Sequence, residues 1–423
     1  MTTTINRTEV DTLIVNIGEL ATLAGPNDRP RRGRALGELG LVRNAALAIR
    51  DGRIACVGPA RDVLDAIAQT PRTHVIDAAG GTVTPGLIDP HTHLVFGGTR
   101  EEEFVMRLQG RSYAEILAAG GGIHQSVSTT RAASVDQLAA QGRAALERML
   151  ANGTTTLEAK SGYGLDLDTE LKQLEAIARL AAEGPQEIVA TFLGAHAVPA
   201  GQDADAYVNF LVATAIPEVA RRKLARYCDV FCEQGVFTPA QTERIFEAAT
   251  AHGLGLRLHA DELSDLGGGA LAARLKAASA DHLLMLGEQS IAALAASETV
   301  AVMLPGTPFF LDMKERAPAR KLVERGVALA LGTDFNPGSC FSESMPMMMT
   351  LACLQLKLTP SEALACATIN AAHALGLADR LGSLEPGKQA DLVLWDAPNH
   401  AHLAYHFGVQ LTRHVLKRGE VVK

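Results

Sequence analysis

From about residue 82 onward, short apolar runs alternate with alanine-rich amphipathic segments, and this alternation restricts the possible folds more than any other feature. Two of the amphipathic segments read SVDQLAAQGRAALERMLANG and DTELKQLEAIARLAAEG. Strands that alternate with helices are typical of βα units around a parallel sheet. We therefore expect an α/β fold over this part of the chain.

Eight apolar runs with adjoining polar residues are candidate strands: TPGLIDPHTH, TTTLEAKSG, EIVATFLGAHA, CDVFCEQ, GLRLHADE, SADHLLML, TVAVMLPG and VALALGTD. Eight successive βα units favour a (β/α)8 barrel of the TIM type. An open doubly wound sheet is the weaker alternative, because no GxGxxG motif opens the first βα turn.

The two ends of the chain resemble each other and differ from the middle. Residues 11–80 are short apolar stretches separated by DG, GP and GG, and the chain returns to this character after about residue 380. We expect residues 1–80 and 380–423 to form one composite β domain, a small β-sandwich. Residues 81–379 then form the barrel.

Charge and composition exclude several classes of partner. The formal net charge of −8 argues against binding to nucleic acid or to an anionic membrane surface. No apolar run is long enough to span a bilayer, and the first residues do not read as a signal peptide. The six cysteines form no CxxC pair, so we expect a reduced, cytoplasmic protein.

The first candidate strand ends in two histidines with one residue between them, His91 and His93. Residues i and i+2 of a strand point to the same side, so both imidazoles would face the mouth of the barrel. Active sites of such barrels lie at that mouth. Taken alone the HxH motif is a modest signal, because structural histidines are at least as common.

Other strand ends strengthen the functional interpretation. Five of the 13 histidines fall on predicted strands or their ends, where simple core packing would place apolar residues. His196 ends the third strand, His259 ends the fifth, His282 lies near the start of the sixth and Asp334 ends the eighth. Four of these side chains are predicted to ligate a divalent metal such as Zn²⁺ or Fe²⁺: His91, His93, His259 and Asp334.

A metal in this place would give the neighbouring groups definite tasks, because it brings the pKa of a water molecule toward neutrality. Glu262 would move a proton between the water and a leaving nitrogen, although the same residue is also explained as a solvated loop acid. His282 would donate to a carbonyl oxygen as charge builds there. Asp334 would serve both as a ligand and as a proton acceptor.

The number of metal ions can be argued from a lysine. Some barrels with two metals bridge them with a carboxylated lysine at the end of the fourth strand. Here that strand ends VFCEQ, and Lys160 ends the second strand instead. We expect one divalent or trivalent ion per chain, Zn or Fe, while Glu233 remains a conceivable bridging ligand.

Several longer motifs resemble those of the amidohydrolase superfamily, in its HxH/His/Asp subtype with one metal. They include PGLIDPHTHLVFGGTREEEF, LEAKSGYGLD, LGAHAVP, CDVFCEQGVF, LPGTPFFL, LGTDFNPGSC and GKQADLVLWD. KSGYGL together with GTDFNPGS is the most specific combination. It resembles the hydrolases of histidine degradation that open the cyclic amide of 4-imidazolone-5-propanoate and form N-formimidoyl-L-glutamate.

The resemblance implies a small-molecule substrate that carries a carboxylate. Relatives are often homodimers, and the sequence leaves the oligomeric state open. Arg100 would pair with the propionate through a bidentate fork. Without the resemblance, Arg100 beside Glu101–Glu103 would be a solvated loop arginine, and Asn336–Gly338 an ordinary turn. The expected substrate-binding residues are Arg100, Tyr163, His196, Glu262, Asn336, Gly338 and Ser339, with Glu262, His282 and Asp334 as the catalytic set.

Two other functions compete with this hypothesis. A nucleobase deaminase of the same superfamily would have the same metal site, but a neutral base gives Arg100 nothing to neutralise. A barrel without catalytic activity, kept as an assembly module, should have lost ligands, and all four are present.

Overall fold

Eight parallel strands form the central sheet of the computed structural model, which describes residues 8–26, 28–111, 115–116 and 120–423. Each strand pairs with the next one along the chain. The strands are β8 (Leu87–Asp89), β9 (Thr154–Lys160), β10 (Glu187–Ala195), β11 (Tyr227–Cys232), β12 (Gly255–Ala260), β13 (Ser279–His282), β14 (Val300–Met303) and β15 (Leu329–Leu331). Every strand lies within one of the eight runs expected from the sequence, apart from the first residue of β11.

The sheet closes between the segments that follow its first and last strands. The Asp334 N–H donates to the carbonyl of His91 at 3.0 Å, and the His93 N–H donates to the carbonyl of Phe335 at 2.9 Å. Because these bonds join β8 to β15 at their carboxyl ends, the predicted (β/α)8 barrel is confirmed. The closure also places two histidines and an aspartate of the expected site side by side.

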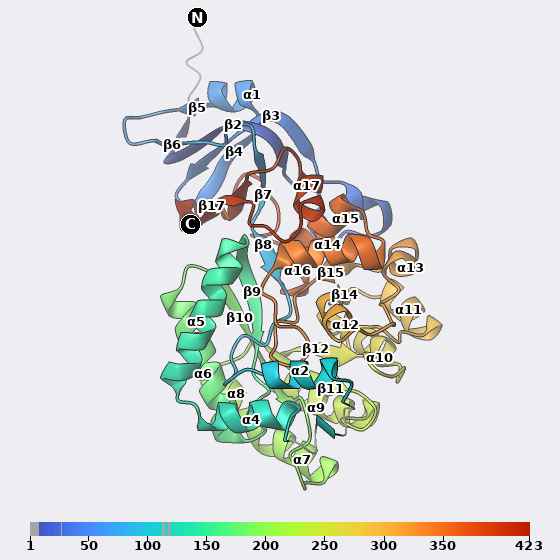
Figure 1. Ribbon diagram of the computed structural model, residues 1–423. Helices are drawn as coiled ribbons and strands as arrows, with labels where there is room; N and C mark the ends of the chain where they lie inside the picture. Colours follow the sequence, from blue (N-terminus) through green and yellow to red (C-terminus); the bar gives the residue numbers. More distant parts are fainter. Residues whose placement is uncertain (1–7, 27, 112–114, 117–119) are drawn as a thin grey trace, which may run out of the picture.

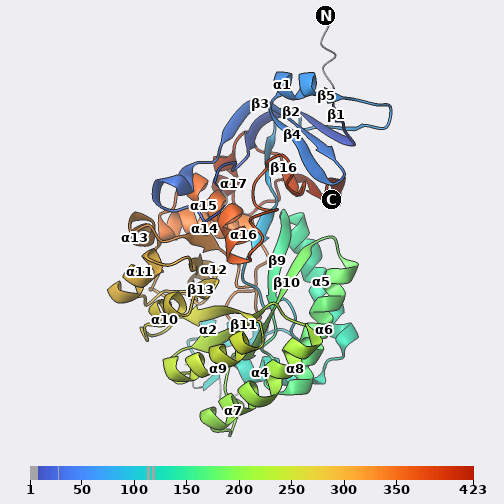
Figure 2. The same ribbon diagram turned by 180° about the vertical axis from the view of Figure 1, so that it is seen from behind.

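Helices cover the outside of the barrel (Figures 1 and 2). The two quoted amphipathic segments form α5 (Val135–Ala151) and α6 (Leu167–Glu183), which begin after the capping residues Ser134 and Asp166. The remaining helices are α1 (Ala60–Ala66), α2 (Glu101–Leu108), α4 (Ile123–Ala132), α7 (Ala204–Phe210), α8 (Ile216–Arg222), α9 (Pro239–Ala251), α10 (Gly268–Arg274), α11 (Glu288–Ala295), α12 (Gly306–Phe310), α13 (Ala319–Glu324), α14 (Met345–Leu356), α15 (Pro360–Cys366), α16 (Ile369–Ala374) and α17 (His400–Tyr405), with a 3-10 turn η1 (Gly33–Gly37) and a π-helical turn η2 (Leu211–Ala215). Within the described ranges, no helix combines the length and the apolar character needed to cross a membrane.

A second, mixed sheet combines the two ends of the chain, and Figure 1 shows it above the barrel. Its main path runs β18-β17-β16-β7-β2-β3-β4, and β6 pairs with β2. The strands are β2 (Thr12–Ala21), β3 (Leu41–Arg50), β4 (Arg53–Pro59), β6 (His74–Asp77), β7 (Thr82–Pro85), β16 (Leu392–Trp395), β17 (Thr412–Lys417) and β18 (Glu420–Val421), while β1 (Thr8–Glu9) and β5 (Ile67–Ala68) pair separately.

The small β domain built from both chain ends is thereby confirmed, with its own apolar core. Strands from the N-terminal and C-terminal segments contribute to one cluster that includes Ile14, Leu47, Val83, Leu394 and Leu416. The boundaries at residues 80 and 380 stay a prediction; β7 lies beyond the first of them and pairs with β16. Residues 1–7 of the expected domain lie outside the described residues.

The sixth strand differs from expectation. The apolar run SADHLLML predicts a strand with His282 near its start, but β13 ends at His282. His282 and Leu283 have φ angles of 76° and 61°, so the chain leaves the extended conformation there. Backbone strain of this kind is common where a side chain must be aimed into a site, and His282 consequently lies at the barrel mouth.

Candidate active site

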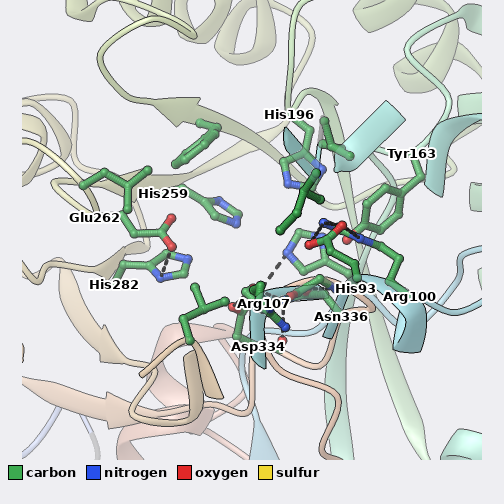
Figure 3. A pocket seen from close by; sticks show the side chains of 18 of the residues that line it. His93, Arg100, Arg107, Tyr163, His196, His259, Glu262, His282, Asp334 and Asn336 are labelled. Carbon is green, nitrogen blue, oxygen red and sulfur yellow. Dashed lines mark hydrogen bonds and ion pairs between the residues drawn. The ribbon is translucent and has the colours of Figure 1, made fainter. Parts of the chain in front are cut away.

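The four predicted metal ligands come together at the carboxyl ends of the barrel strands. The ligand nitrogens of His91, His93 and His259 lie within 4.8 Å of one another. Asp334 Oδ1 is 3.4 Å from Nε2 of both His91 and His93. All four side chains are buried, and Figure 3 shows His93, His259 and Asp334 converging. The three nitrogens therefore form one group of possible ligand atoms, and Asp334 joins it through His91 and His93; His91, His282 and Asp334 form a second such group.

The hydrogen bonds of two histidines fit a metal ion at that point. Nδ1 of His91 lies 2.7 Å from Asp281, and Nδ1 of His259 lies 3.1 Å from Asp229. Within the described residues, the buried Nε2 atoms of both imidazoles have no hydrogen-bond partner. A carboxylate on Nδ1 selects the tautomer whose Nε2 carries a lone pair. Two buried lone pairs without a donor are what a resident cation would satisfy.

Glu262 and His282 lie beside this cluster (Figure 3). Glu262 follows β12, and its Oε1 is 3.5 Å from Nδ1 of His282. Burial, together with the charges of Asp334 and Glu233, raises the pKa of Glu262 to about 8. Burial lowers the pKa of His282 well below its usual range. A neutral carboxyl group and a neutral imidazole therefore face the cluster at neutral pH.

Glu233, considered above as a bridging ligand, has a different position. Its carboxylate accepts hydrogen bonds from the N–H groups of Gln234 and Leu263, both at 2.8 Å, and from the hydroxyl of Ser264. In the described part of the chain, two groups of ligand atoms could hold a metal, one from His91, His93 and His259 and one from His91, His282 and Asp334, and Glu233 belongs to neither. Glu233 instead fixes the loop that carries Glu262.

A cavity of about 520 Å³ opens above the cluster. Its walls include all the residues that the sequence analysis assigned to substrate binding, and the structure thus brings them together. They are Arg100, Tyr163, His196, Glu262, Asn336, Gly338 and Ser339. Arg107 and Arg111 also line the cavity and were not expected from the sequence.

Arg100 is held by Glu103, the last of the three glutamates that follow it in the sequence. Its Nε and Nη2 donate to Glu103 at 2.7–2.9 Å, and Glu103 is buried. Glu103 also accepts the N–H of Gly122 at 2.9 Å. A Cβ on Gly338 would overlap Nη1 of Arg100. Gly338 therefore makes room for the guanidinium.

The loop after β15 is organised by Asn336. Its Oδ1 accepts the N–H groups of Gly338 and Ser339, each at 2.8 Å, and its Nδ2 donates to the carbonyl of Asp334 and to the Ser339 hydroxyl, each at 2.7 Å. Thr307, another residue that sequence reasoning missed, donates to Asp334 Oδ2 at 2.6 Å. Asn336 and Thr307 thus orient the carboxylate ligand.

Two rings form the wall on the side of β9 and β10. The imidazole of His196 stacks on His93 with ring centres 4.9 Å apart, and Tyr163 lies 5.2 Å from His196. Nδ1 of His196 is 3.0 Å from the carbonyl of Gly162, which makes Nε2 an acceptor. Burial lowers the pKa of His196 to about 3, so this imidazole stays neutral.

Comparison with known proteins gives consistent results. The model of the amidohydrolase family matches residues 82–422. An imidazolonepropionase from Symbiobacterium thermophilum is 52% identical over 98% of this chain and 97% of its own length. One from Geobacillus kaustophilus is 50% identical over 96% of each chain.

Solved structures with the same architecture are much more distant in sequence. An adenosine deaminase from Xanthomonas campestris with bound zinc has a TM-score of 0.70 at 21% identity and covers 98% of this chain and 93% of its own. A 5-methylcytosine deaminase from Klebsiella pneumoniae has a TM-score of 0.73 at 15% identity, with 97% and 98% covered. These similarities extend to the fold alone.

Proposed function

Since the chain belongs to the amidohydrolase family, we propose that it is an imidazolonepropionase, a hydrolase that opens the ring of 4-imidazolone-5-propanoate to give N-formimidoyl-L-glutamate. One observation carries the proposal: four imidazoles, the Asp334 carboxylate, the Glu262 carboxyl group and the half-buried Arg100 guanidinium border a single cavity. The identity to relatives with this name extends over nearly the whole chain.

His91, His93, His259 and Asp334 would hold one metal ion, Zn or Fe. When bound, such an ion supplies Lewis acidity that polarises a carbonyl group and acidifies water. A single ion is supported by Glu233, whose carboxylate already accepts from three donors, one on its own loop and two on the loop that carries Glu262.

Arg100 and Tyr163 orient the substrate. Glu103 occupies Nε and Nη2 of Arg100, so the guanidinium is fixed while Nη1 remains to pair with the propionate. Tyr163 is buried beside it, and burial raises the pKa of its hydroxyl, which stays a hydrogen-bond donor. The Nε2 acceptor of His196 suits an N–H of the imidazolone ring.

The proton transfers follow from the different environments of two carboxyl groups. Water attacks the carbonyl carbon of the ring amide, and Asp334 accepts the proton that the water loses. His282 donates a hydrogen bond to the carbonyl oxygen as negative charge develops. Glu262, protonated at neutral pH, gives its proton to the ring nitrogen as the C–N bond breaks, and is reprotonated before the next cycle.

The decisive experiment is incubation of purified protein with 4-imidazolone-5-propanoate, with elemental analysis of the same sample. We expect the ring absorbance to disappear, N-formimidoyl-L-glutamate to form in equal amount, and about one metal ion per chain. A fully metallated sample that leaves the ring intact contradicts the proposal. Release of ammonia from a nucleobase would then favour the deaminase, and a protein without metal would favour the assembly module.

A further inference from the structure

Five charged side chains fill the barrel directly beneath the imidazole cluster. Glu158 and Lys160 come from β9, Asp229 from β11, Arg257 from β12 and Asp281 from β13. Each of them has no solvent-exposed surface. Charged side chains are rarely buried this completely, and the mechanism above uses none of them.

Lys160 lies at the centre of this group. Its Nζ is 2.7 Å from Glu158 Oε1 and 2.7 Å from Asp229 Oδ2, and 3.8 Å from Asp281 Oδ2. The two aspartates come from strands that are separated by β12. The ammonium group of Lys160 therefore lies between the carboxylates of Asp229 and Asp281, whose strands do not pair with each other.

Arg257 completes the group from the other side. Its guanidinium is 3.2 Å from Glu158 and 3.6 Å from Asp281. It also donates to the carbonyl groups of Pro90 and Ala374, at 2.6 and 2.8 Å. Each of the three carboxylates is consequently restrained by at least one cation.

The same two aspartates hold two of the proposed metal ligands. Asp281 Oδ2 contacts Nδ1 of His91 at 2.7 Å, and Asp229 Oδ1 contacts Nδ1 of His259 at 3.1 Å. Asp229 uses its other oxygen for Lys160. The orientation of both imidazoles thus depends on carboxylates that share Lys160 as a neighbouring cation, by a hydrogen bond to Asp229 and an ion pair with Asp281.

The charges of these five side chains indicate what the group contributes to the protein. Three carboxylates face two cations, so a further positive charge above them is favourable. Burying ions costs several kcal/mol each, and well-packed apolar residues often serve stability as well or better. A group of this kind gives little evidence of added stability, whereas it matches the need to fix the ligands of a cation.

We propose that Lys160 is a positioning residue for the metal site. Its ammonium group holds Asp229 and Asp281 so that His259 and His91 present Nε2 to the ion. The inference rests on the proposed metal-dependent function. It assigns Lys160 no contact with substrate and no proton transfer, because its Nζ is enclosed by carboxylates below the imidazoles. Its effect should appear in metal affinity even when no substrate is present.

The test compares Lys160→Met with Lys417→Met. Lys417 is also a buried lysine, paired with Asp391 at 2.5 Å and hydrogen-bonded to Thr156 on the same strand β9, but it contacts none of the proposed ligands. Zinc affinity is measured by equilibrium dialysis against buffered Zn²⁺. Loss of support for a ligand typically lowers metal affinity about 10- to 100-fold, and we expect this for Lys160→Met. Lys417→Met should lower thermal stability without changing zinc affinity.

The visible spectrum of the cobalt-substituted protein gives a second readout, because it reports ligand geometry directly. We expect a changed spectrum for Lys160→Met and an unchanged one for Lys417→Met. Unaltered zinc affinity in Lys160→Met, or an equal loss in both variants, overturns the inference. If Lys160→Met does not fold, Asp229→Asn replaces it with the same expectation, and full affinity in that variant also overturns the inference. Failure of the unmodified protein to bind zinc would instead contradict the proposed function.

Discussion

The surroundings of Glu262 raise the pKa of its carboxyl group, and this matters for the proposed reaction. Its carboxyl group is buried next to the negative charges of Asp334 and Glu233, and its pKa is raised to about 8. A glutamic acid in water is ionised at neutral pH, whereas this one retains its proton. One carboxyl group of the site can therefore donate a proton while Asp334 accepts one.

This difference predicts the pH dependence of turnover. Below about pH 8 Glu262 holds the proton that the leaving nitrogen needs, so kcat should be level there and fall as the pH rises through about 8. Glu262→Gln should lower kcat about 10²- to 10⁴-fold and keep full metal content. Steady-state kinetics and elemental analysis check both statements.

His259→Ala serves as the comparison, because it removes a proposed ligand and should lose metal and activity together. Infrared spectroscopy offers an independent check on the proton. In the difference spectrum between the unmodified protein and Glu262→Gln at neutral pH, one carbonyl band of a protonated carboxylic acid should be lost. A glutamine variant with unchanged kcat would contradict the proposed role.

Gly338 is the second residue with a sharp expectation. A methyl group at this position would overlap Nη1 of Arg100 and displace the guanidinium from the cavity wall. Overpacking of this kind costs about 1–3 kcal/mol, so Gly338→Ala should raise KM about tenfold or more with a smaller effect on kcat. Gly37→Ala is the control, since a Cβ there meets no atom within 4 Å. Equal KM values in both variants would rule out this account of Gly338.

At the level of elements, the loop after β12 is held by an acid that follows the neighbouring strand β11. Glu233 follows β11 and accepts the N–H of Leu263 and the hydroxyl of Ser264, which come directly after Glu262. The loop and the general acid are therefore fixed by one carboxylate, whose negative charge also contributes to the raised pKa of Glu262.

Glu233→Gln should consequently change the pH profile. Without the charge at Glu233 the pKa of Glu262 falls, so the alkaline decline of kcat should begin at lower pH, while zinc content stays the same. Kinetics over a pH series measure this shift. Glu362→Gln, which alters a carboxylate paired with Arg320 far from the site, should leave the profile in place. A Glu233→Gln profile identical to that of the unmodified protein would contradict the expectation.

At the scale of the whole molecule, a buried acid links the small β domain to the outer helices of the barrel. Glu19 on β2 contacts Nδ1 of His400 and accepts the His400 N–H, both at 2.7 Å. Nε2 of His400 is 2.9 Å from the hydroxyl of Ser361 on α15. The chain ends are in this way attached to the barrel by polar contacts as well as by the shared sheet.

Glu19→Ala should destabilise the protein without disturbing the active site. Leaving the buried hydrogen-bond donors of His400 without their acceptor typically costs about 1–3 kcal/mol, so the denaturation midpoint should fall clearly, while kcat and KM below the transition stay the same. Glu38→Ala, at an exposed position, should change stability by no more than about 0.5 kcal/mol. Chemical denaturation followed by circular dichroism compares them, and equal midpoints would show that the link is unimportant.

Local sequence patterns alone determined the succession of elements and the chemical types of the site. The apolar runs predict all eight barrel strands, and the periodicity of segments such as α5 and α6 predicts helices, because these signals depend on residues that are close in the chain. Histidines at strand ends could also be chosen as site residues from local sequence. Residues i and i+2 of a strand share a face, and the active site of such a barrel lies at the carboxyl ends of its strands.

Only the tertiary structure decided which groups hold those ligands in place. Asp281 and His91 are 190 residues apart, and nothing local marks them as partners before the barrel closes. The early end of β13 at His282 and the central position of Lys160 likewise depend on closure. A buried polar residue inside an apolar strand, such as Asp229 in CDVFCEQ, was the signal that could have revealed this layer, since a charge enters a core only where another charge or a donor meets it.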